Sequence, residues 1–174
     1  MSIISDMKKF IVTVLILIFV FTFFSCKENN EDFIRIHIRA NSDGESDQEI
    51  KLVVRDVVVT FLTPLLKDAI SVQEAEKIIR ENVDVLDNKI ELMLNKCGYE
   101  YGANIKIDRE YFDDKSYGEL TLKAGVYKAV IVSLGKGVGK NWWCVAYPPL
   151  CFSGEDYNKI KYKSYFYEIF NNKE

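Results

Sequence analysis

The sequence predicts an α+β domain in which a helix hairpin packs on one face of a mainly antiparallel sheet. Two observations support this fold class. Apolar residues recur at helical spacing between residues 46 and 97, whereas before and after that region they alternate with polar residues. The predicted order is one strand, two helices and then several strands, which is typical of domains whose helices lie on one face of a sheet.

Strict alternation over residues 33–39 predicts the first strand. Ile34, Ile36 and Ile38 share one face, and the other face carries Phe33, Arg35, His37 and Arg39. This pattern is typical of a half-buried strand, with one face on the core and one in water.

Two helices are predicted next, and each begins with a capping box. The first box starts at Ser46, and the apolar stripe behind it continues to Pro64, which should break or kink the helix. The second box starts at Ser71, and Gly98 provides the C-terminal stop. The short break between the helices predicts an antiparallel pair.

Period-two patterns and apolar runs predict the remaining strands. They cover residues 103–110, 126–134 and 141–147, with a polar connection over residues 113–125. Residues 158–170 are predicted to form a last strand, with a short helix as the alternative.

An apolar segment near the N-terminus predicts export. Residues 10–24 carry no charge and follow a pair of lysines. As a helix they would span about 22 Å, which is short of the roughly 30 Å hydrocarbon core of a membrane. We therefore expect residues 1–26 to be a signal peptide or an uncleaved membrane anchor, with a lipoprotein signal at Cys26 or a buried core helix as alternatives. Residues 27–32 are then a linker, and residues 33–170 form a single domain.

The overall composition excludes some classes of protein. The chain has 174 residues, of which 48% are apolar, and its 23 basic side chains stand against 26 acidic ones. A net charge of −3 argues against a nucleic-acid-binding protein, which normally has a basic surface. The chain has one histidine and four cysteines, too few ligands for a histidine-dependent metal site, so we expect no metal and no cofactor.

The glycine-rich segment 135–141 (GKGVGKN) has a superficial likeness to a phosphate-binding loop. Its glycines Gly135 and Gly139 are separated by three residues instead of four, and Asn141 stands where that motif needs a hydroxyl for magnesium. The segment that follows has the pattern of a strand, so no helix N-terminus would face a phosphate. We therefore predict a tight hairpin turn.

Catalytic chemistry has few candidates. His37 is the only histidine, so a Cys–His hydrolase would have to pair it with Cys144 or Cys151. A satisfied histidine on the polar face of a strand is the more common situation. Carboxylates between residues 43 and 49 could bind calcium, but such residues are ordinary at the start of a helix.

Cys144 and Cys151 are also candidates for a disulfide. They would close a loop of eight residues, and disulfides are permitted outside the cytosol. Such a bond would contribute about 2.5 kcal/mol through chain entropy. The alternative is that Cys97, Cys144 and Cys151 are all reduced and buried.

Trp142 and Trp143 give the chain its best candidate surface for a protein partner. Adjacent residues of a strand point to opposite faces, so one ring can enter the core while the other is exposed or covered by something else. Tryptophan is enriched at binding hot spots, and Pro148, Pro149 and Phe152 follow closely in the sequence. The alternative is that both rings are covered within a two-sided sheet.

Two long segments carry signatures that are not generic motifs. They are IHIRANSDGESDQEIKLVVRDVV (residues 36–58) and AGVYKAVIVSLGKGVGKNWWCVAYPPLCF (residues 124–152). Together, and in this order, they resemble the stage II sporulation protein R family of endospore-forming Firmicutes. Arg39 departs from the family pattern, in a position where an apolar residue is expected.

The resemblance implies a signalling protein and not an enzyme. Proteins of this family are made in the forespore and exported into the space between the two sporulation membranes. There they trigger the mother cell's membrane-embedded aspartic protease, which processes the precursor of sigma factor E. The resemblance implies no catalytic residue.

Carried over position by position, the resemblance leads to the hypothesis that the loop after the first strand and the segment around the tryptophans contact the protease. The candidate partner-binding residues are His37, Asn41, Ser42, Asp43, Asp47, Arg55, Asp56, Asn141, Trp142, Trp143, Pro148 and Pro149. The alternatives are a secreted Cys/His hydrolase and a lipid-anchored extracytoplasmic ligand-binding module.

Overall fold

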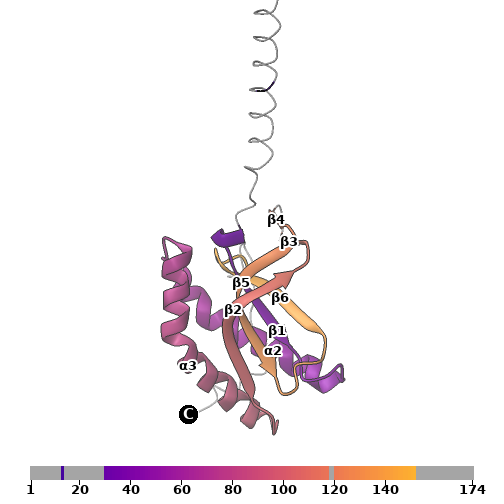
Figure 1. Ribbon diagram of the computed structural model, residues 1–174. Coiled ribbons are helices and arrows are strands. Elements are labelled where there is room, and N and C mark those ends of the chain that lie inside the picture. The colour runs from indigo at the N-terminus through magenta and orange to yellow at the C-terminus, as the bar shows by residue number, and fades with distance from the viewer. Residues whose placement is uncertain (1–12, 14–29, 118–119, 152–174) are drawn as a thin grey trace, which may run out of the picture.

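The computed structural model describes residues 13, 30–117 and 120–151 of the chain (Figure 1). The elements of this part are, in order, η1 (Asn30–Asp32), β1 (Ile34–Arg39), α2 (Glu45–Leu66), α3 (Val72–Lys96), β2 (Ala103–Phe112), β3 (Lys115–Tyr117), β4 (Leu120–Leu122), β5 (Gly125–Leu134) and β6 (Asn141–Tyr147). Apart from residue 13, the predicted export segment lies outside the described residues, and so does the predicted last strand, 158–170. None of the helices described is both long enough and apolar enough to cross a membrane.

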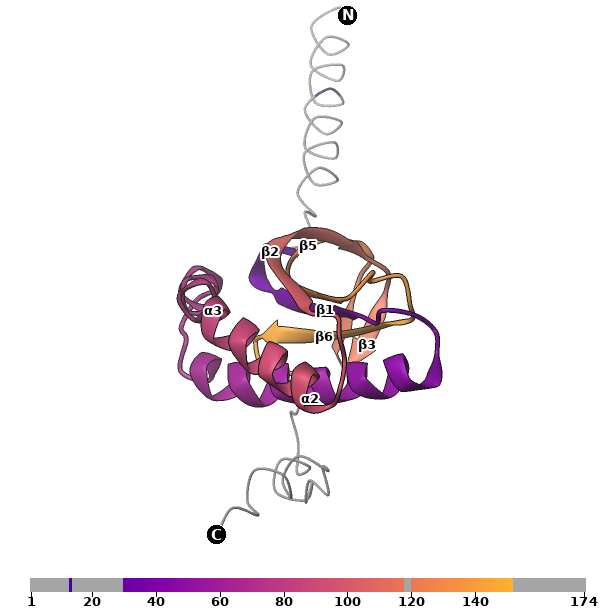
Figure 2. The same cartoon turned by 90° about the horizontal axis from the view of Figure 1, so that it is seen from below.

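The main sheet has the strand order β2-β5-β1-β6. β5 pairs antiparallel with β2 and parallel with β1, and β1 pairs antiparallel with β6. Two of the three pairings are therefore antiparallel, and α2 and α3 lie on the same side of this sheet (Figure 2). The predicted α+β fold class is confirmed.

The larger apolar cluster fills the space between the helices and the sheet. α2 contributes a stripe that includes Val54 and Leu62, α3 contributes Ile79 and Ile90, and all four side chains are at most 2% exposed. Burying a side chain of this size stabilises the fold by roughly 1.5–3 kcal/mol. Because most of the β-branched stripe of α2 lies in this cluster, packing compensates for its weak helix propensity.

The first strand differs from its prediction, because both of its faces are buried. Ile34, Ile36 and Ile38 face the helices as expected, but on the other face Arg35 is only 1% exposed and His37 only 6%. β1 lies between two other strands, and a second apolar cluster covers part of the face away from the helices. We call this face of the sheet the second face.

The two capping boxes have different outcomes. α2 begins after Gly44 without a side-chain cap, and the Ser46 hydroxyl lies 2.6 Å from that of Tyr99 instead, so the first box is wrong. At α3 the Ser71 hydroxyl accepts a hydrogen bond from the amide of Glu74 at 3.1 Å, which confirms the predicted start. The Glu74 carboxylate, however, accepts from the amide of Ile70.

The helix ends also differ from each other. α2 continues through Pro64 to Leu66, so the helix does not break there, and of the two predicted effects only a kink stays a prediction. Leu62 and Leu66 are both buried on either side of the proline, and their packing holds the last turn although one backbone hydrogen bond is missing. α3 ends before Gly98, whose φ of 79° confirms the predicted stop.

A small hairpin occupies part of the segment that was predicted to be a polar connection. β3 and β4 pair antiparallel within residues 113–125, and Leu122 at the end of β4 belongs to the apolar cluster on the second face. Strands of three residues are too short to show a period in the sequence.

The glycine-rich segment connects strands that are not neighbours, so the predicted tight hairpin turn is wrong. β1 lies between β5 and β6, and residues 135–140 therefore pass over the end of β1. Gly139 donates its amide to the carbonyl of Ala40 at 2.9 Å, and a Cβ at Gly139 would collide with the backbone of Ser42. The close approach of two backbones explains the glycine at this position.

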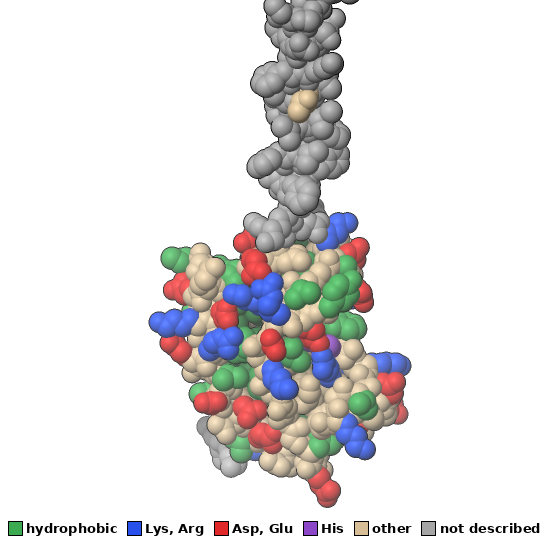
Figure 3. Space-filling model, in the orientation of Figure 1, with side chains coloured by type: hydrophobic (Ala, Val, Ile, Leu, Met, Phe, Trp, Pro, Cys, Tyr) green, Lys and Arg blue, Asp and Glu red, His purple; other side chains and the backbone are tan. Residues whose placement is uncertain are grey.

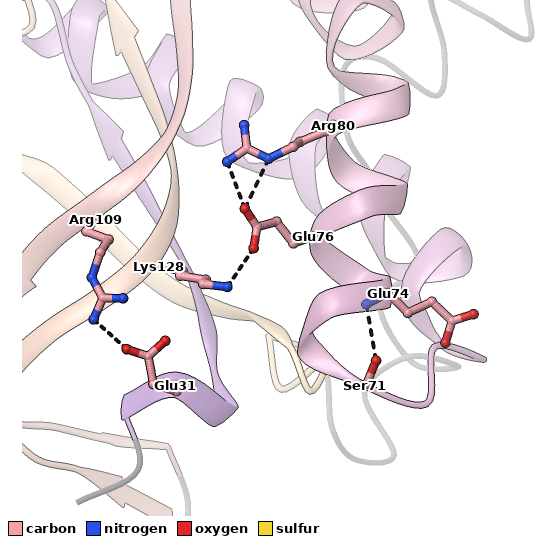
Figure 4. Close-up of polar contacts among 7 residues, drawn as sticks. All are labelled: Glu31, Ser71, Glu74, Glu76, Arg80, Arg109 and Lys128. Atoms are coloured by element: carbon pink, nitrogen blue, oxygen red, sulfur yellow. Dashed lines mark hydrogen bonds and ion pairs between the residues drawn. The ribbon is translucent and has the colours of Figure 1, made fainter.

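Ion pairs connect α3 and η1 with strands of the main sheet (Figure 4). The Glu76 carboxylate accepts hydrogen bonds from Lys128 of β5 at 2.6 Å and from Arg80 of α3 at 2.7 Å. These hydrogen bonds, that of Lys128 above all, hold the pKa of the Glu76 carboxyl below its usual value. Arg109 of β2 donates to Glu31 of η1 at 2.6 Å.

Candidate functional site

The loop after β1 and the glycine-rich loop form one hydrogen-bonded structure, which we call the loop junction (residues 40–47 and 135–141). Its centre is the carboxylate of Asp47. One oxygen accepts from Asn41 at 2.8 Å and from Ser42 at 2.5 Å, and the other accepts from the Tyr101 hydroxyl at 2.5 Å. Burial by itself would raise the pKa of Asp47, but the hydrogen bonds together outweigh it and hold this pKa below its usual value.

Backbone amides join the two loops of the junction. Asn41 accepts a hydrogen bond from the amide of Lys136 at 2.9 Å, and Asp43 accepts one from the amide of Lys140 at 2.7 Å. The buried Lys51 donates to the Lys140 carbonyl at 3.1 Å. The predicted partner-binding residues of this loop therefore have hydrogen-bond partners within the domain, and they fix the shape of the junction.

The tryptophan pair is divided between the two faces of the sheet. Trp142 packs against the apolar cluster on the helix side, and the guanidinium carbon of Arg55 lies 5.9 Å from its ring centre. Trp143 lies on the second face and is 38% exposed. Of the two alternatives, the structure agrees with one core ring and one exposed ring.

The second face carries a polar group around His37. Its ring stacks on Trp143 with the ring centres 5.5 Å apart, and its Nδ1 lies 2.7 Å from a carboxylate oxygen of Glu110. The other oxygen of Glu110 accepts from Arg39. Glu110 thus explains why a cation is tolerated at position 39, where the family pattern led us to expect an apolar residue.

A pocket of about 350 Å³ opens beside His37 and Trp143. Its lining residues come from β1, β2, β3, β6 and the segment between β2 and β3. They are Arg35, His37, Tyr111, Phe112, Asp113, Asp114, Lys115, Asn141 and Trp143. Asn141 also belongs to the loop junction, so the junction and the pocket are adjacent.

The candidate partner-binding residues Pro148 and Pro149 lie away from the pocket and the loop junction. Pro148 and Pro149 follow the far end of β6. Pro148 is the fifth residue after Trp143, a distance of about 17 Å along an extended chain. A disulfide between Cys144 and Cys151, with their Cα atoms 5.8 Å apart, fastens this end.

The structure therefore divides the candidate residues into four groups. These are Asn41, Ser42, Asp43, Asp47 and Asn141 in the loop junction, His37 and Trp143 on the second face, Arg55, Asp56 and Trp142 on the helix side, and Pro148 and Pro149 at the far end. The first two groups are neighbours, the third lies across the sheet from the second, and the prolines lie at the other end of β6.

The geometry gives no support to a Cys–His hydrolase. Cys144 packs on the helix side of the sheet and is bonded to Cys151, whereas His37 lies on the second face. Within the described ranges, no group of three or more His, Cys, Asp or Glu side chains is arranged to hold a metal ion. On the face shown in Figure 3, acidic and basic side chains are interspersed.

Sequence reasoning missed two residues of this site, Arg35 and Glu110. The alternation of β1 places Arg35 and His37 on one face, but it does not reveal that this face is covered. Glu110 lies 73 residues from His37 in the sequence, and only the fold brings their side chains together.

Fold and site together define an α+β domain with a polar pocket beside an exposed tryptophan. The family model described as stage II sporulation protein R matches residues 30–157, so the chain belongs to the stage II sporulation protein R family. It is similar to stage II sporulation protein R of Bacillus subtilis (strain 168), with 39% identity over 119 residues, or 68% of this chain and 53% of that protein. The chain thus spans about half the length of this curated relative. No solved structure matches it.

Proposed function

We propose that this chain is an exported signalling protein of sporulation that binds the extracytoplasmic part of a membrane-embedded aspartic protease and triggers processing of the sigma-E precursor. Membership of the stage II sporulation protein R family carries this proposal. In this proposal the chain crosses the forespore membrane by means of residues 1–26 and acts in the intermembrane space. It is either free or anchored through residues 10–24, and it works by docking and not by catalysis.

The contact surface that we propose is the second face around Trp143 together with the adjacent loop junction. An exposed indole that stacks on His37 offers a large apolar surface in a defined orientation. Aromatic anchors of this kind are enriched among residues that dominate binding energy. The loop junction is held by internal hydrogen bonds, so its surface is already ordered before a partner binds.

The free energy needed to activate the protease sets a minimum for the number of side chains that must contact it. An activator shifts its target only through its different affinities for the inactive and active states. Moving a protease from 1% to 99% active requires a differential of roughly 5.5 kcal/mol. One hot-spot side chain contributes about 2–4 kcal/mol, so Trp143 needs at least one further anchor, and the adjoining pocket is the nearest candidate.

The test is reconstitution in a bacterium that does not sporulate. Protease, sigma-E precursor and this chain are expressed together, and precursor processing is followed by immunoblot. We expect processing to depend on the wild-type chain and to be lost with Trp143→Ala. Leu92→Ala is the matched control, because Leu92 is also an exposed large apolar residue but lies on α3.

Two results would overturn different parts of the proposal. If the wild-type chain does not stimulate processing, the proposed function is wrong. If Trp143→Ala reaches the normal exported level and processes normally, the contact surface is wrong and the function stands.

A further inference from the structure

Arg35 is a buried cation that forms no ion pair within the part of the chain that the structure describes. Its side chain extends from the central strand and is 1% exposed. Nη2 donates to the Tyr117 hydroxyl at 2.8 Å. Nε and Nη1 have no hydrogen-bond partner among the described residues. Burying a charge with unmade hydrogen bonds is unfavourable, so the arrangement calls for an acceptor.

Aromatic rings hold this guanidinium in place. Its central carbon lies 4.2 Å from the ring centre of Phe112, 5.1 Å from that of Tyr127 and 5.8 Å from that of Tyr117. The faces of these rings stabilise the positive charge, but they offer no acceptor for the N–H groups in the guanidinium plane. The cage therefore fixes the position of the guanidinium and leaves two of its nitrogens, Nε and Nη1, buried without an acceptor among the described residues.

His37 supplies a second polar atom on the same face. It is two residues further along β1, and side chains two residues apart in a strand point the same way. Its Nδ1 is engaged by Glu110, and its buried Nε2 has no partner among the described residues. In the imidazolium form, Nε2 is a donor.

Both residues line the pocket beside Trp143. Its volume of about 350 Å³ is at the lower end of the range of small-ligand sites, which suits a side chain or a small acid. Asp113 and Asp114 are exposed residues of its lining. Their charges oppose a doubly charged phosphate more than a singly charged carboxylate.

We propose that this pocket binds a carboxylate, with Arg35 and His37 as the binding groups, and that the carboxylate is an acidic side chain of the protein partner. The carboxylate site stands on the geometry of the pocket. The assignment of its occupant to the partner rests on the proposed function, and a free small carboxylate is the other source of the same chemistry.

Binding is tested by recording ¹H–¹⁵N spectra of the purified full chain. The probe is a glutamate residue blocked at both ends, the corresponding glutamine is the uncharged control, and inorganic phosphate is the third ligand. We expect the glutamate probe to shift the Arg35 Nε–H and Trp143 indole signals, with a dissociation constant on the order of 10 mM. The indole signal of Trp142, on the helix side, should not move.

Arg35→Lys is the first variant, because it keeps the charge and loses the planar donors. We expect it to weaken binding of the glutamate probe about tenfold. His37→Gln is a second variant in case the first does not fold, and Arg80→Lys, on an exposed part of α3, is the matched control. The same variants are then tested for precursor processing, which Arg35→Lys should reduce and Arg80→Lys should not.

The outcomes test the carboxylate site and the assignment of its occupant to the partner separately. Absence of a saturable shift with the glutamate probe, or equal shifts with the glutamine control, overturns the carboxylate site. Tighter binding of phosphate overturns the choice of ligand. If the probe binds but folded Arg35→Lys supports normal processing, the occupant is a small carboxylate and not the partner. If the wild-type chain fails to stimulate processing, the proposed function is wrong, and the spectra still decide the pocket.

Discussion

His37 and Trp143 lie opposite each other on the neighbouring strands β1 and β6, with their ring centres 5.5 Å apart and their planes inclined by 29°. The stack fixes the direction of an indole that is 38% exposed. Trp142, its neighbour in the chain, packs on the other side of the sheet beside Arg55. Two adjacent tryptophans thus have separate roles, one in the core and one at the surface.

These roles predict losses of stability of different size for the two alanine variants. Trp142→Ala removes a partly buried ring from the core and should lower the free energy of unfolding by about 2–3 kcal/mol. Trp143→Ala loses mainly the stack on His37, which is about 0.5–1.5 kcal/mol. Urea denaturation of both variants measures the difference. A larger loss for Trp143→Ala would contradict the division of roles.

The hydrogen bonds of the loop junction predict that Asp47 contributes to the free energy of unfolding in a pH-dependent way. Its pKa is lowered in the folded state by hydrogen bonds that outweigh burial, so it stabilises the fold above its unfolded pKa of about 3.9. That stability is lost as the pH falls from there through the lower folded pKa. At about pH 7, Asp47→Asn should cost about 1–3 kcal/mol.

Urea denaturation of the wild-type chain and of Asp47→Asn at about pH 7 and about pH 3 tests the direction of this pH dependence. The difference in unfolding free energy should shrink at the lower pH, because Asp47 of the unfolded wild-type chain takes up a proton there more readily than Asp47 of the folded chain. Asp84→Asn on α3 is a suitable control, because its side chain takes no part in the junction. A difference that grows on acidification would show that Asp47 is not stabilised as a carboxylate.

The disulfide predicts a moderate stabilisation of the far end of β6. Cys144 and Cys151 close a loop of eight residues, for which chain entropy gives about 2.5 kcal/mol. The Cys144→Ser, Cys151→Ser double variant should lose about this amount in urea denaturation. Mass spectrometry of the alkylated wild-type chain provides the direct check: Cys97 should react without prior reduction, and Cys144 and Cys151 only after it.

The longer elements could be predicted because each carries its own local pattern, which β3 and β4 are too short to show. The strand at residues 141–147 follows from its apolar run and the prolines that end it. The start of α3 follows from Ser71, whose hydroxyl can reach the amide of Glu74 in any context. Such predictions depend only on residues that are close in the sequence.

What the sequence does not reveal is which strands are neighbours. β1 alternates like a half-buried strand, yet it is central, because β5 and β6 pair on either side of it. Because β1 lies between β5 and β6, the glycine-rich loop is a connection over the end of β1 and not a hairpin turn. The pocket was missed for this reason too, since only the fold brings Phe112 and Asp113 beside His37.

Alanine variants of two glycines test whether residues 135–140 pass closely over the loop that follows β1. Gly139 approaches the backbone of Ser42 so closely that a methyl group would collide with it, and that backbone cannot move without disturbing the Asp47 hydrogen bonds. Gly98 has a positive φ of 79° but has open space around the position of a Cβ. Gly98→Ala should therefore cost about 1–2 kcal/mol through backbone strain alone. Gly139→Ala should cost more, about 3 kcal/mol or above, because the clash adds to the loss of the junction. Thermal unfolding of both variants decides the order, and an equal or smaller loss for Gly139→Ala would contradict the close contact between the two loops.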